Sequence, residues 1–268
     1  MNFHPPKDIV DIGLDAGIKK AVMPVNKILA LSILAGAYIA FAAIGSTMAM
    51  HDIPSAGFAR FIAGVVFSTG LMLVVICGAE LFTGNTLLSI GYLENKISFL
   101  KVMRNWFWVY VGNIVGSVLL AYLMYVSGLW EYNSSAHGVY ALKIALGKVN
   151  LTFAGAFARG ILCNWLVCLA VWMAYSAKDT TGKILGIFFP IMMFITSAFE
   201  HSVANMYYLS AGLFLKQTAI SGVIDPNLLQ TLTLSSSVIN NLIPVTLGNI
   251  VGGAFFVGGI YWYSFMKK

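Results

Sequence analysis

The sequence predicts an all-α membrane protein whose six transmembrane helices form two inverted repeats of three. Three observations carry this prediction: a strongly apolar composition, six apolar stretches of membrane-spanning length, and motifs that recur once in each half. Of the 268 residues, 59% are hydrophobic and only 10% are charged, and the mean hydropathy is +0.84. Water-soluble domains are much more polar, so we expect this chain in a lipid bilayer.

The six apolar stretches are each long enough to cross a hydrocarbon core of about 30 Å, which takes about 20 helical residues. They are continuously apolar rather than alternating, which disfavours the strands of a membrane barrel. In chain order they cover Ile28 to Met50, Phe61 to Tyr92, Phe107 to Trp130, Leu151 to Tyr175, Ile184 to Phe214 and Ile239 to Met266.

The segment before the first stretch, residues 1–27, is predicted to be a short amphipathic helix on the cytoplasmic face. Asp8, Asp11, Asp15 and Lys19 recur at helical spacing opposite apolar residues. A signal peptide would be positively charged where the three aspartates lie, so we do not expect a cleaved signal. Residues 1–268 are therefore predicted to form a single transmembrane domain.

The charges between the apolar stretches predict the orientation. Eleven lysines and arginines fall on one side and four on the other, so the positive-inside rule places both termini in the cytoplasm. The formal net charge of +6 then reflects topology, and no nucleic-acid partner is expected. The eleven are Lys7, Lys19, Lys20, Lys27, Lys96, Lys101, Arg104, Lys178, Lys183, Lys267 and Lys268, and the four are Arg60, Lys143, Lys148 and Lys216.

Two motifs occur twice and indicate the repeat. GNIVG is found at Gly112 to Gly116 and at Gly248 to Gly252, which we expect near the start of the third and sixth helices. Glycines at four-residue spacing predict close helix packing rather than a transport role. Because each half has three helices, the second half enters the membrane from the opposite side, and functional sites of such folds gather at the midplane.

The second motif places a glutamate five residues before an asparagine, in GAELFTGN and in SAFEHSVAN. It lies in the second and fifth stretches, which are long enough to be broken helices. The predicted breaks are Thr83, Gly84 and Asn85 in one half and His201, Ser202 and Asn205 in the other. Non-helical backbone at membrane depth requires protein or a water-filled cavity around it, so the breaks should mark a pore.

Three ionisable residues lie inside the apolar stretches. Glu80 and Glu200 are expected to support the breaks, together with Asn85 and Asn205, by accepting the amide hydrogens that the breaks set free. His201 is expected to have a role in the pore. Neither a metal site nor a cofactor is expected, because no ligands stand at metal-binding spacing; Cys77, Cys163 and Cys168 are predicted to be buried core thiols.

Four segments resemble signatures of the formate and nitrite transporter family, and their order matches across nearly the whole chain. They are CGAELFTGN (Cys77 to Asn85), RGILCNWLVCLAVW (Arg159 to Trp172), FEHSVANM (Phe199 to Met206) and NLIPVTLGNIVGG (Asn241 to Gly253). The resemblance implies an aquaporin-like channel domain, assembled as a homopentamer with one pore per protomer in a prokaryotic-type cell (inner) membrane. It implies a small monovalent anion as substrate: formate, hydrosulfide or nitrite.

The resemblance also implies roles for individual residues. An outer constriction would comprise Phe67 and Phe194 and an inner constriction Leu71 and Leu81; the pore centre would comprise Thr83, His201 and Asn164, and Lys148 would supply positive potential toward the outer mouth. Helical spacing is compatible with these pairs. Without the resemblance, the four apolar residues would be assigned to ordinary packing.

Two mechanisms stay open at this point. The anion could cross in charged form, stabilised by donors and positive potential, or it could take a proton from His201 and cross as a neutral acid. An aquaporin-type channel for neutral solutes is disfavoured because neither break contains Asn-Pro-Ala. A membrane-embedded enzyme is disfavoured because the sequence lacks HExxH, paired aspartates and a nucleophile motif. Gating by the N-terminal segment and the direction of flux are not determined by the sequence.

Overall fold

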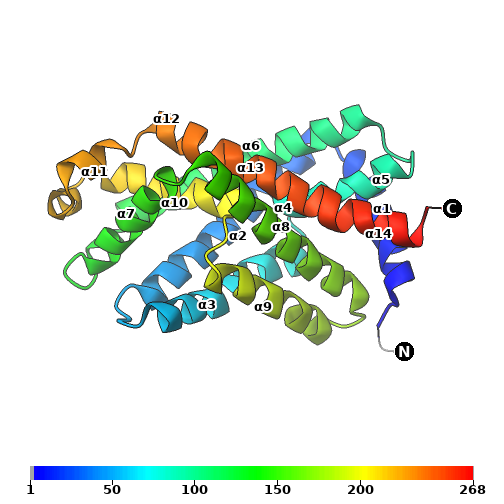
Figure 1. Ribbon diagram of the computed structural model, residues 1–268, viewed down its shortest axis with the longest axis horizontal. Helices are drawn as coiled ribbons and strands as arrows, with labels where there is room; N and C mark the ends of the chain where they lie inside the picture. Colours follow the sequence, from blue (N-terminus) through cyan, green and yellow to red (C-terminus); the bar gives the residue numbers. More distant parts are fainter. Residues whose placement is uncertain (1–2, 268) are drawn as a thin grey trace.

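A computed structural model describes residues 3–267 as a bundle of helices (Figure 1). The predicted domain and the count of basic residues also include residues 1, 2 and 268, which lie outside this range. The described residues contain no strand, only an isolated antiparallel bridge between Phe3 and Ala177. The architecture is therefore all-α.

The helices follow one another in two comparable halves. The first half contains α1 (Pro6–Ala21), α2 (Val25–Met50), α3 (Ala56–Cys77), α4 (Phe82–Asn85), η1 (Thr86–Leu88), α5 (Ser89–Leu93) and α6 (Phe99–Val126). The second half contains η2 (Leu129–Glu131), α7 (Ala136–Val149), α8 (Phe153–Ser176), α9 (Thr180–Thr196), α10 (Ser202–Leu215), η3 (Ala219–Val223) and α11 (Pro226–Gln230). It ends in one long helix made of α12 (Leu234–Ser236), the π-helical η4 (Ser237–Leu242), α13 (Ile243–Ile250), the π-helical η5 (Val251–Gly259) and α14 (Ile260–Phe265).

Within residues 3–267, five helices are long and apolar enough to cross a membrane: α2, α3, α6, α8 and the run from α12 to α14. The sixth crossing is shared by α9, which has 17 residues, and α10 after a break. Both chain ends lie at the same end of the bundle, as six crossings require (Figure 1). Several helices begin before their apolar stretch, and α6 starts at Phe99 because the Ser98 side chain accepts the Lys101 amide.

The two breaks lie a few residues before their predicted positions. The helix α3 ends at Cys77, Gly78 follows with φ +81°, and α4 begins at Phe82. In the second half, α9 ends at Thr196 and α10 begins at Ser202. The prediction that Thr83, Gly84, Asn85, Ser202 and Asn205 interrupt the helices was wrong, because these residues belong to α4 and α10; among the six, only His201 lies outside a helix, as the N-cap of α10. A left-handed glycine, not the polar residues, ends α3.

The two GNIVG motifs pack helices together, as predicted. A Cβ on Gly116 of α6 would collide with the carbonyl oxygen of Ile33 in α2, and one on Gly248 of α13 would collide with that of Phe157 in α8. Their expected position near a helix start was wrong: both lie in the middle of their helices, which begin earlier than the apolar stretches do. The pairs α6–α2 and α13–α8 thus correspond, which gives the inverted repeat.

The predicted N-terminal helix is present as α1. Asp8, Asp11, Asp15 and Lys19 are exposed on it, while Ile9 and Val10 are among its buried residues. The cysteine prediction is confirmed for Cys163 and Cys168 and was wrong for Cys77, which is exposed at the last residue of α3. Among the described residues, no cluster of His, Cys, Asp or Glu could hold a metal ion.

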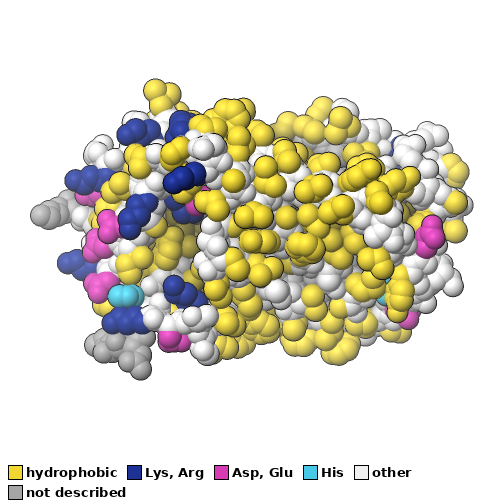
Figure 2. Space-filling model, turned by 180° about the vertical axis from the view of Figure 1, so that it is seen from behind, with side chains coloured by type: hydrophobic (Ala, Val, Ile, Leu, Met, Phe, Trp, Pro, Cys, Tyr) yellow, Lys and Arg dark blue, Asp and Glu magenta, His cyan; other side chains and the backbone are white. Residues whose placement is uncertain are grey.

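The surface is divided by chemistry along the long axis. Figure 2 shows a broad field of hydrophobic side chains over the middle of the bundle, and lysines, arginines and acidic residues gathered at the end that carries the chain termini. A wide apolar surface between polar ends is what a bilayer requires of a spanning protein.

Candidate functional site

A small enclosed cavity lies at the centre of the bundle. Its volume is about 10 Å³, roughly the room of one water molecule. It brings together all four residues of the predicted constrictions and the predicted histidine: its lining is Ile39, Phe67, Leu71, Leu81, Val167, Ile191, Phe194 and His201. His201 is therefore the one polar side chain in an otherwise apolar lining.

Two aromatic rings close one side of this cavity. Phe67 from α3 and Phe194 from α9 meet edge to face, with ring centroids 5.7 Å apart. The Phe194 ring also stacks on the His201 imidazole at 5.9 Å. Both phenylalanines are 1% exposed, so their rings are packed on all sides.

His201 is held by both of its ring nitrogens. Its Nδ1 accepts the backbone N–H of Ala204 at 3.1 Å, which makes His201 the N-cap of α10. Since Nδ1 is an acceptor, the neutral ring carries its proton on Nε2. This Nε2–H lies 2.9 Å from the Thr83 hydroxyl oxygen of α4 and donates to it. This hydrogen bond therefore connects α4, the helix after the first break, to His201, the last residue of the second break.

Of the three residues predicted for the pore centre, only His201 lines the cavity; Thr83 and Asn164 of α8 are not among the lining residues. Asn164 Nδ2 is 3.2 Å from the Thr83 carbonyl oxygen and 2.6 Å from that of Asn249. It is fully buried, and its Oδ1 has no hydrogen-bond partner among the described residues. Asn164 thus fixes the backbone that carries the Thr83 hydroxyl.

In the first half, the buried Glu80 carboxylate is paired with a lysine of α1. Lys20 Nζ is 2.9 Å from Glu80 Oε1, and Asn85 Nδ2 donates to Glu80 Oε2 at 2.7 Å. Asn85 also donates to Asn105 Oδ1 at 2.9 Å, and Asn105 in turn donates to the Lys20 carbonyl oxygen. This network ties α1, the break and α6 together.

The second half repeats the network with different residues. Lys148 Nζ of α7 is 3.0 Å from both Glu200 oxygens, and Asn205 Nδ2 donates to Glu200 Oε2 at 2.6 Å. Asn205 also donates to Asn241 Oδ1 at 2.7 Å, and Asn241 donates to the Lys148 carbonyl oxygen. The glutamates were expected to accept freed backbone amides; instead both accept from lysine and asparagine side chains.

The freed amides are bound by two asparagines that the sequence analysis missed. Asn113 Oδ1 accepts the Phe82 N–H at 2.9 Å, and Asn249 Oδ1 accepts the Ser202 N–H at 2.9 Å. Both stand inside the GNIVG motif. A stronger signal was available, since NWFWVYVGN and NLIPVTLGN each place two asparagines eight residues apart, and the first of each pair is Asn105 or Asn241.

Two larger cavities flank the central one. The α1 vestibule has a volume of about 330 Å³, and its lining includes Lys20, Glu80, Leu71 and Leu81. The two leucines also line the central cavity and therefore separate the two spaces. The α7 vestibule has a volume of about 290 Å³; its lining includes Lys148, Glu200, Ala63 and Ile195, the last two lying one helical turn from Phe67 and next to Phe194.

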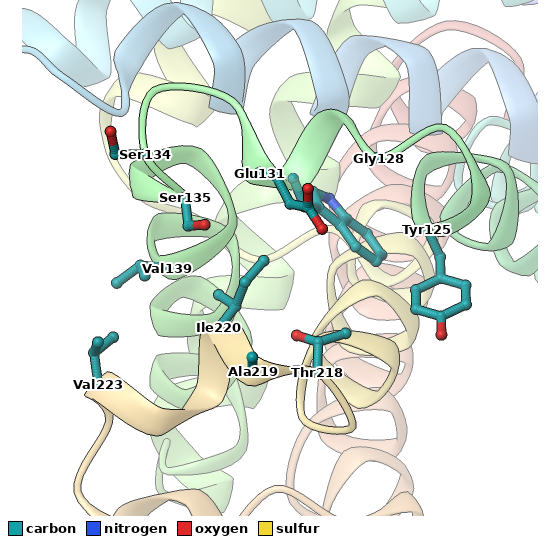
Figure 3. A pocket seen from close by; sticks show the side chains of 11 residues that line it. Tyr125, Gly128, Glu131, Ser134, Ser135, Val139, Thr218, Ala219, Ile220 and Val223 are labelled. Atoms are coloured by element: carbon teal, nitrogen blue, oxygen red, sulfur yellow. The ribbon is translucent and has the colours of Figure 1, made fainter.

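A further depression of about 580 Å³ lies beside α7 and away from this line of cavities. It is formed by the end of α6, η2, α7 and η3, and Figure 3 shows Tyr125, Glu131 and Thr218 around it. Its one charged lining residue is Glu131, whose carboxylate repels anions. It does not have the chemistry of an anion path.

Comparison with known proteins places the chain in a family. A family profile described as Formate/nitrite transporter matches residues 7–263. A probable formate transporter of Methanothermobacter thermautotrophicus is 41% identical over all of this chain and 99% of the relative. The formate channel FocA of Escherichia coli strain K12 is 36% identical, covering 98% of this chain and 95% of the relative.

Two solved structures share the fold. One, described as a pentameric formate channel with formate bound, has a TM-score of 0.80 and 39% identity, and the match covers 91% of this chain and 98% of that one. The other, described as an FNT family ion channel, has a TM-score of 0.84 and 32% identity over 96% and 98%. The chain belongs to the formate/nitrite transporter family, a family of membrane channels and transporters rather than enzymes.

Proposed function

We propose that this protein is a homopentameric membrane channel for a small monovalent anion, with formate as its main substrate. The proposal rests on relatives named as formate channels and on a solved relative described as pentameric with formate bound. In this proposal each protomer contains its own path, which runs from the α7 vestibule past Phe67 and Phe194, through the central cavity, and past Leu71 and Leu81 to the α1 vestibule.

The observation that carries this function is His201, which lines an apolar cavity between two vestibules that each contain a lysine and which is hydrogen-bonded to Thr83. An unsolvated ion in a low-dielectric passage would cost tens of kcal/mol by the Born estimate. The Nε2–H of His201, the Thr83 hydroxyl and the N-terminus of α10 all offer positive ends of dipoles at the narrowest point. This arrangement stabilises an anion there and repels a cation.

The two lysines add little positive potential at long range. Lys20 and Lys148 are each paired with a glutamate at 2.9 and 3.0 Å, so each pair is close to neutral at a distance. We propose that an arriving anion shares the ammonium group with the glutamate, since Nζ has three donors. Lys148 would then act at the mouth of the path as a local donor.

We propose that His201 is a hydrogen-bond donor and not a source of protons. Protonation of Nδ1 would require that the ring give up the Ala204 amide and uncap α10. Transfer of the Nε2 proton to the anion would leave the ring without a proton unless Nδ1 took one up at the same time. The neutral ring with Nε2–H satisfies every contact that the structure gives it.

We propose that the α1 end faces the cytoplasm, because eleven basic residues flank that side and, with Arg159 of the α7 vestibule included, five the other. The chain would then lie in a prokaryotic-type cell membrane with both termini inside, and the α7 vestibule would open outward. The pair Phe67 and Phe194 would be the outer constriction, and the pair Leu71 and Leu81 the inner one.

The function is tested by flux into proteoliposomes containing the purified protein. Formate, nitrite, hydrosulfide and glycerol are compared by stopped-flow under the same gradient. Rapid formate entry with little glycerol entry is expected. Nitrite, a bent anion of similar size, should enter at a comparable rate, and hydrosulfide more slowly because it offers no oxygen to the two donors. Glycerol entry as fast as that of formate would instead indicate a neutral-solute channel.

A further inference from the structure

The two vestibules have the same framework but different charges. Glu80 donates its backbone N–H to the Leu31 carbonyl oxygen at 3.2 Å, and Glu200 donates its own to the Arg159 carbonyl oxygen at 3.3 Å. Each glutamate is also paired with a lysine, as described above. Arg159 therefore occupies, in the second half, the position that Leu31 occupies in the first.

The α7 vestibule contains a second arginine as well. Arg60, in the second turn of α3, lines the same cavity as Arg159, Lys148 and Glu200. The charged residues that line the α1 vestibule are Lys20 and Glu80. The lining of the α7 vestibule is thus net positive by two charges, whereas that of the α1 vestibule is neutral.

The two arginines are available to bind an anion. Both are exposed, and among residues 3–267 neither guanidinium takes part in an ion pair, since the pairs that form are Lys20–Glu80 and Lys148–Glu200. A guanidinium group offers planar pairs of N–H donors that match the two oxygens of a carboxylate. Both side chains line the cavity and have no carboxylate partner of their own among the described residues, so their N–H donors can turn to an anion in it.

We propose that Arg60 and Arg159 form an anion-loading site in the α7 vestibule, which binds a small carboxylate before it reaches Phe67 and Phe194. This inference rests on the proposed function and deepens it, because it makes the two entrances unequal. The path loads at lower anion concentration from the α7 end than from the α1 end. Maximal flux stays the same, because the narrow passage is common to both directions.

The test compares the two directions of entry at low ionic strength, where charges act over a longer range. Formate entry is measured in right-side-out cells and in inside-out vesicles that contain the wild-type protein or the double variant Arg60→Gln/Arg159→Gln. The matched control is Lys143→Gln, which removes a positive charge from an exposed residue of α7 outside the vestibule lining.

In the double variant, the half-saturating formate concentration for entry from the α7 end should rise roughly 3- to 10-fold. Entry from the α1 end, maximal flux and the Lys143→Gln protein should not change. Equal half-saturation for the two proteins at the α7 end would overturn the loading site. A rise in the half-saturating concentration for entry from both ends would overturn it too, since a loading site in the α7 vestibule should affect only entry from that end.

A second measurement tests the site without transport. Phenylglyoxal labelling of arginines in the wild-type protein is read by peptide mass spectrometry with formate or with the same concentration of chloride. Formate should slow labelling of Arg60 and Arg159 but not of Arg104, whose guanidinium donates to the Met23 carbonyl oxygen. Equal labelling of all three in both salts would overturn the loading site. Absence of formate flux together with protection of Arg60 and Arg159 would overturn the proposed function alone.

Discussion

Asn113 and Asn249 make the same three hydrogen bonds in the two halves of the protein. Each Oδ1 accepts the first N–H after a break at 2.9 Å. Each Nδ2 donates at 3.0 Å to the carbonyl oxygen of the glutamate before the break, and at 2.8 Å to a carbonyl oxygen of the neighbouring helix, that of Ser32 or Gly160. An asparagine at the equivalent position in each half therefore stabilises the non-helical backbone of each break.

We expect Asn113→Ala and Asn249→Ala each to destabilise the protein. Each change removes the partner of a buried amide and of the buried glutamate carbonyl group before the break, at a cost of about 1–3 kcal/mol per group. The thermal midpoint of the detergent-solubilised protein should fall, and formate flux should fall with it. Asn227→Ala is the control because Asn227 is exposed on α11; a similar loss in all three proteins would contradict this role.

Removal of one charge of the Lys148–Glu200 pair should destabilise the protein more than removal of both charges. Glu200 is 5% exposed, so Lys148→Met leaves a buried carboxylate without its cation, a change that costs about 3–5 kcal/mol in buried pairs. The double variant Lys148→Met/Glu200→Gln should recover part of the thermal midpoint. A double variant less stable than either single variant would show that the pair is not coupled.

Phe194→Ala should widen the passage next to the central cavity. Removal of the ring opens space between Phe67 and His201, so acetate and lactate should enter faster relative to formate. Phe189→Ala is the matched control, since Phe189 is on the same helix but 54% exposed. An unchanged ratio of acetate to formate entry in the Phe194 variant would mean that this ring does not limit the passage.

The sequence predicted the general architecture because long apolar runs and recurring motifs depend on few physical requirements. Six crossings, the inverted repeat and the glycine packing of GNIVG follow from membrane thickness and close helix contact. The exact break positions were not predicted, because polar residues in an apolar stretch do not by themselves interrupt a helix. Thr83 and Asn85 are polar because their side chains bind across the bundle, while the chain leaves the helix at the left-handed Gly78.

The site was predictable only in part. Composition and spacing indicated His201 as a pore residue. Phe67 and Leu71 could be assigned to the path only through the family resemblance, since apolar residues that line a pore and apolar residues that face lipid look the same in a sequence. The partners of Glu80 and Glu200 could not be predicted, because Lys20 and Lys148 lie on other helices, far from them in the sequence. Arg60 and Arg159 could be assigned to the site only from the structure, which shows that both line one cavity although they are 99 residues apart in the sequence.

The role of His201 as a hydrogen-bond donor is tested most directly by formate uptake with simultaneous recording of internal pH, from about pH 5 to 8, where histidine titrates. Wild type, His201→Asn and His201→Ala are compared. Our account predicts that His201→Asn, which retains an N–H donor, conducts formate with the pH profile of the wild type. It predicts that His201→Ala loses about 10- to 100-fold in flux, the effect of one hydrogen bond to a charged group. Loss of the proton-accompanied, pH-dependent component of uptake in His201→Asn would contradict the account and show that the histidine transfers a proton.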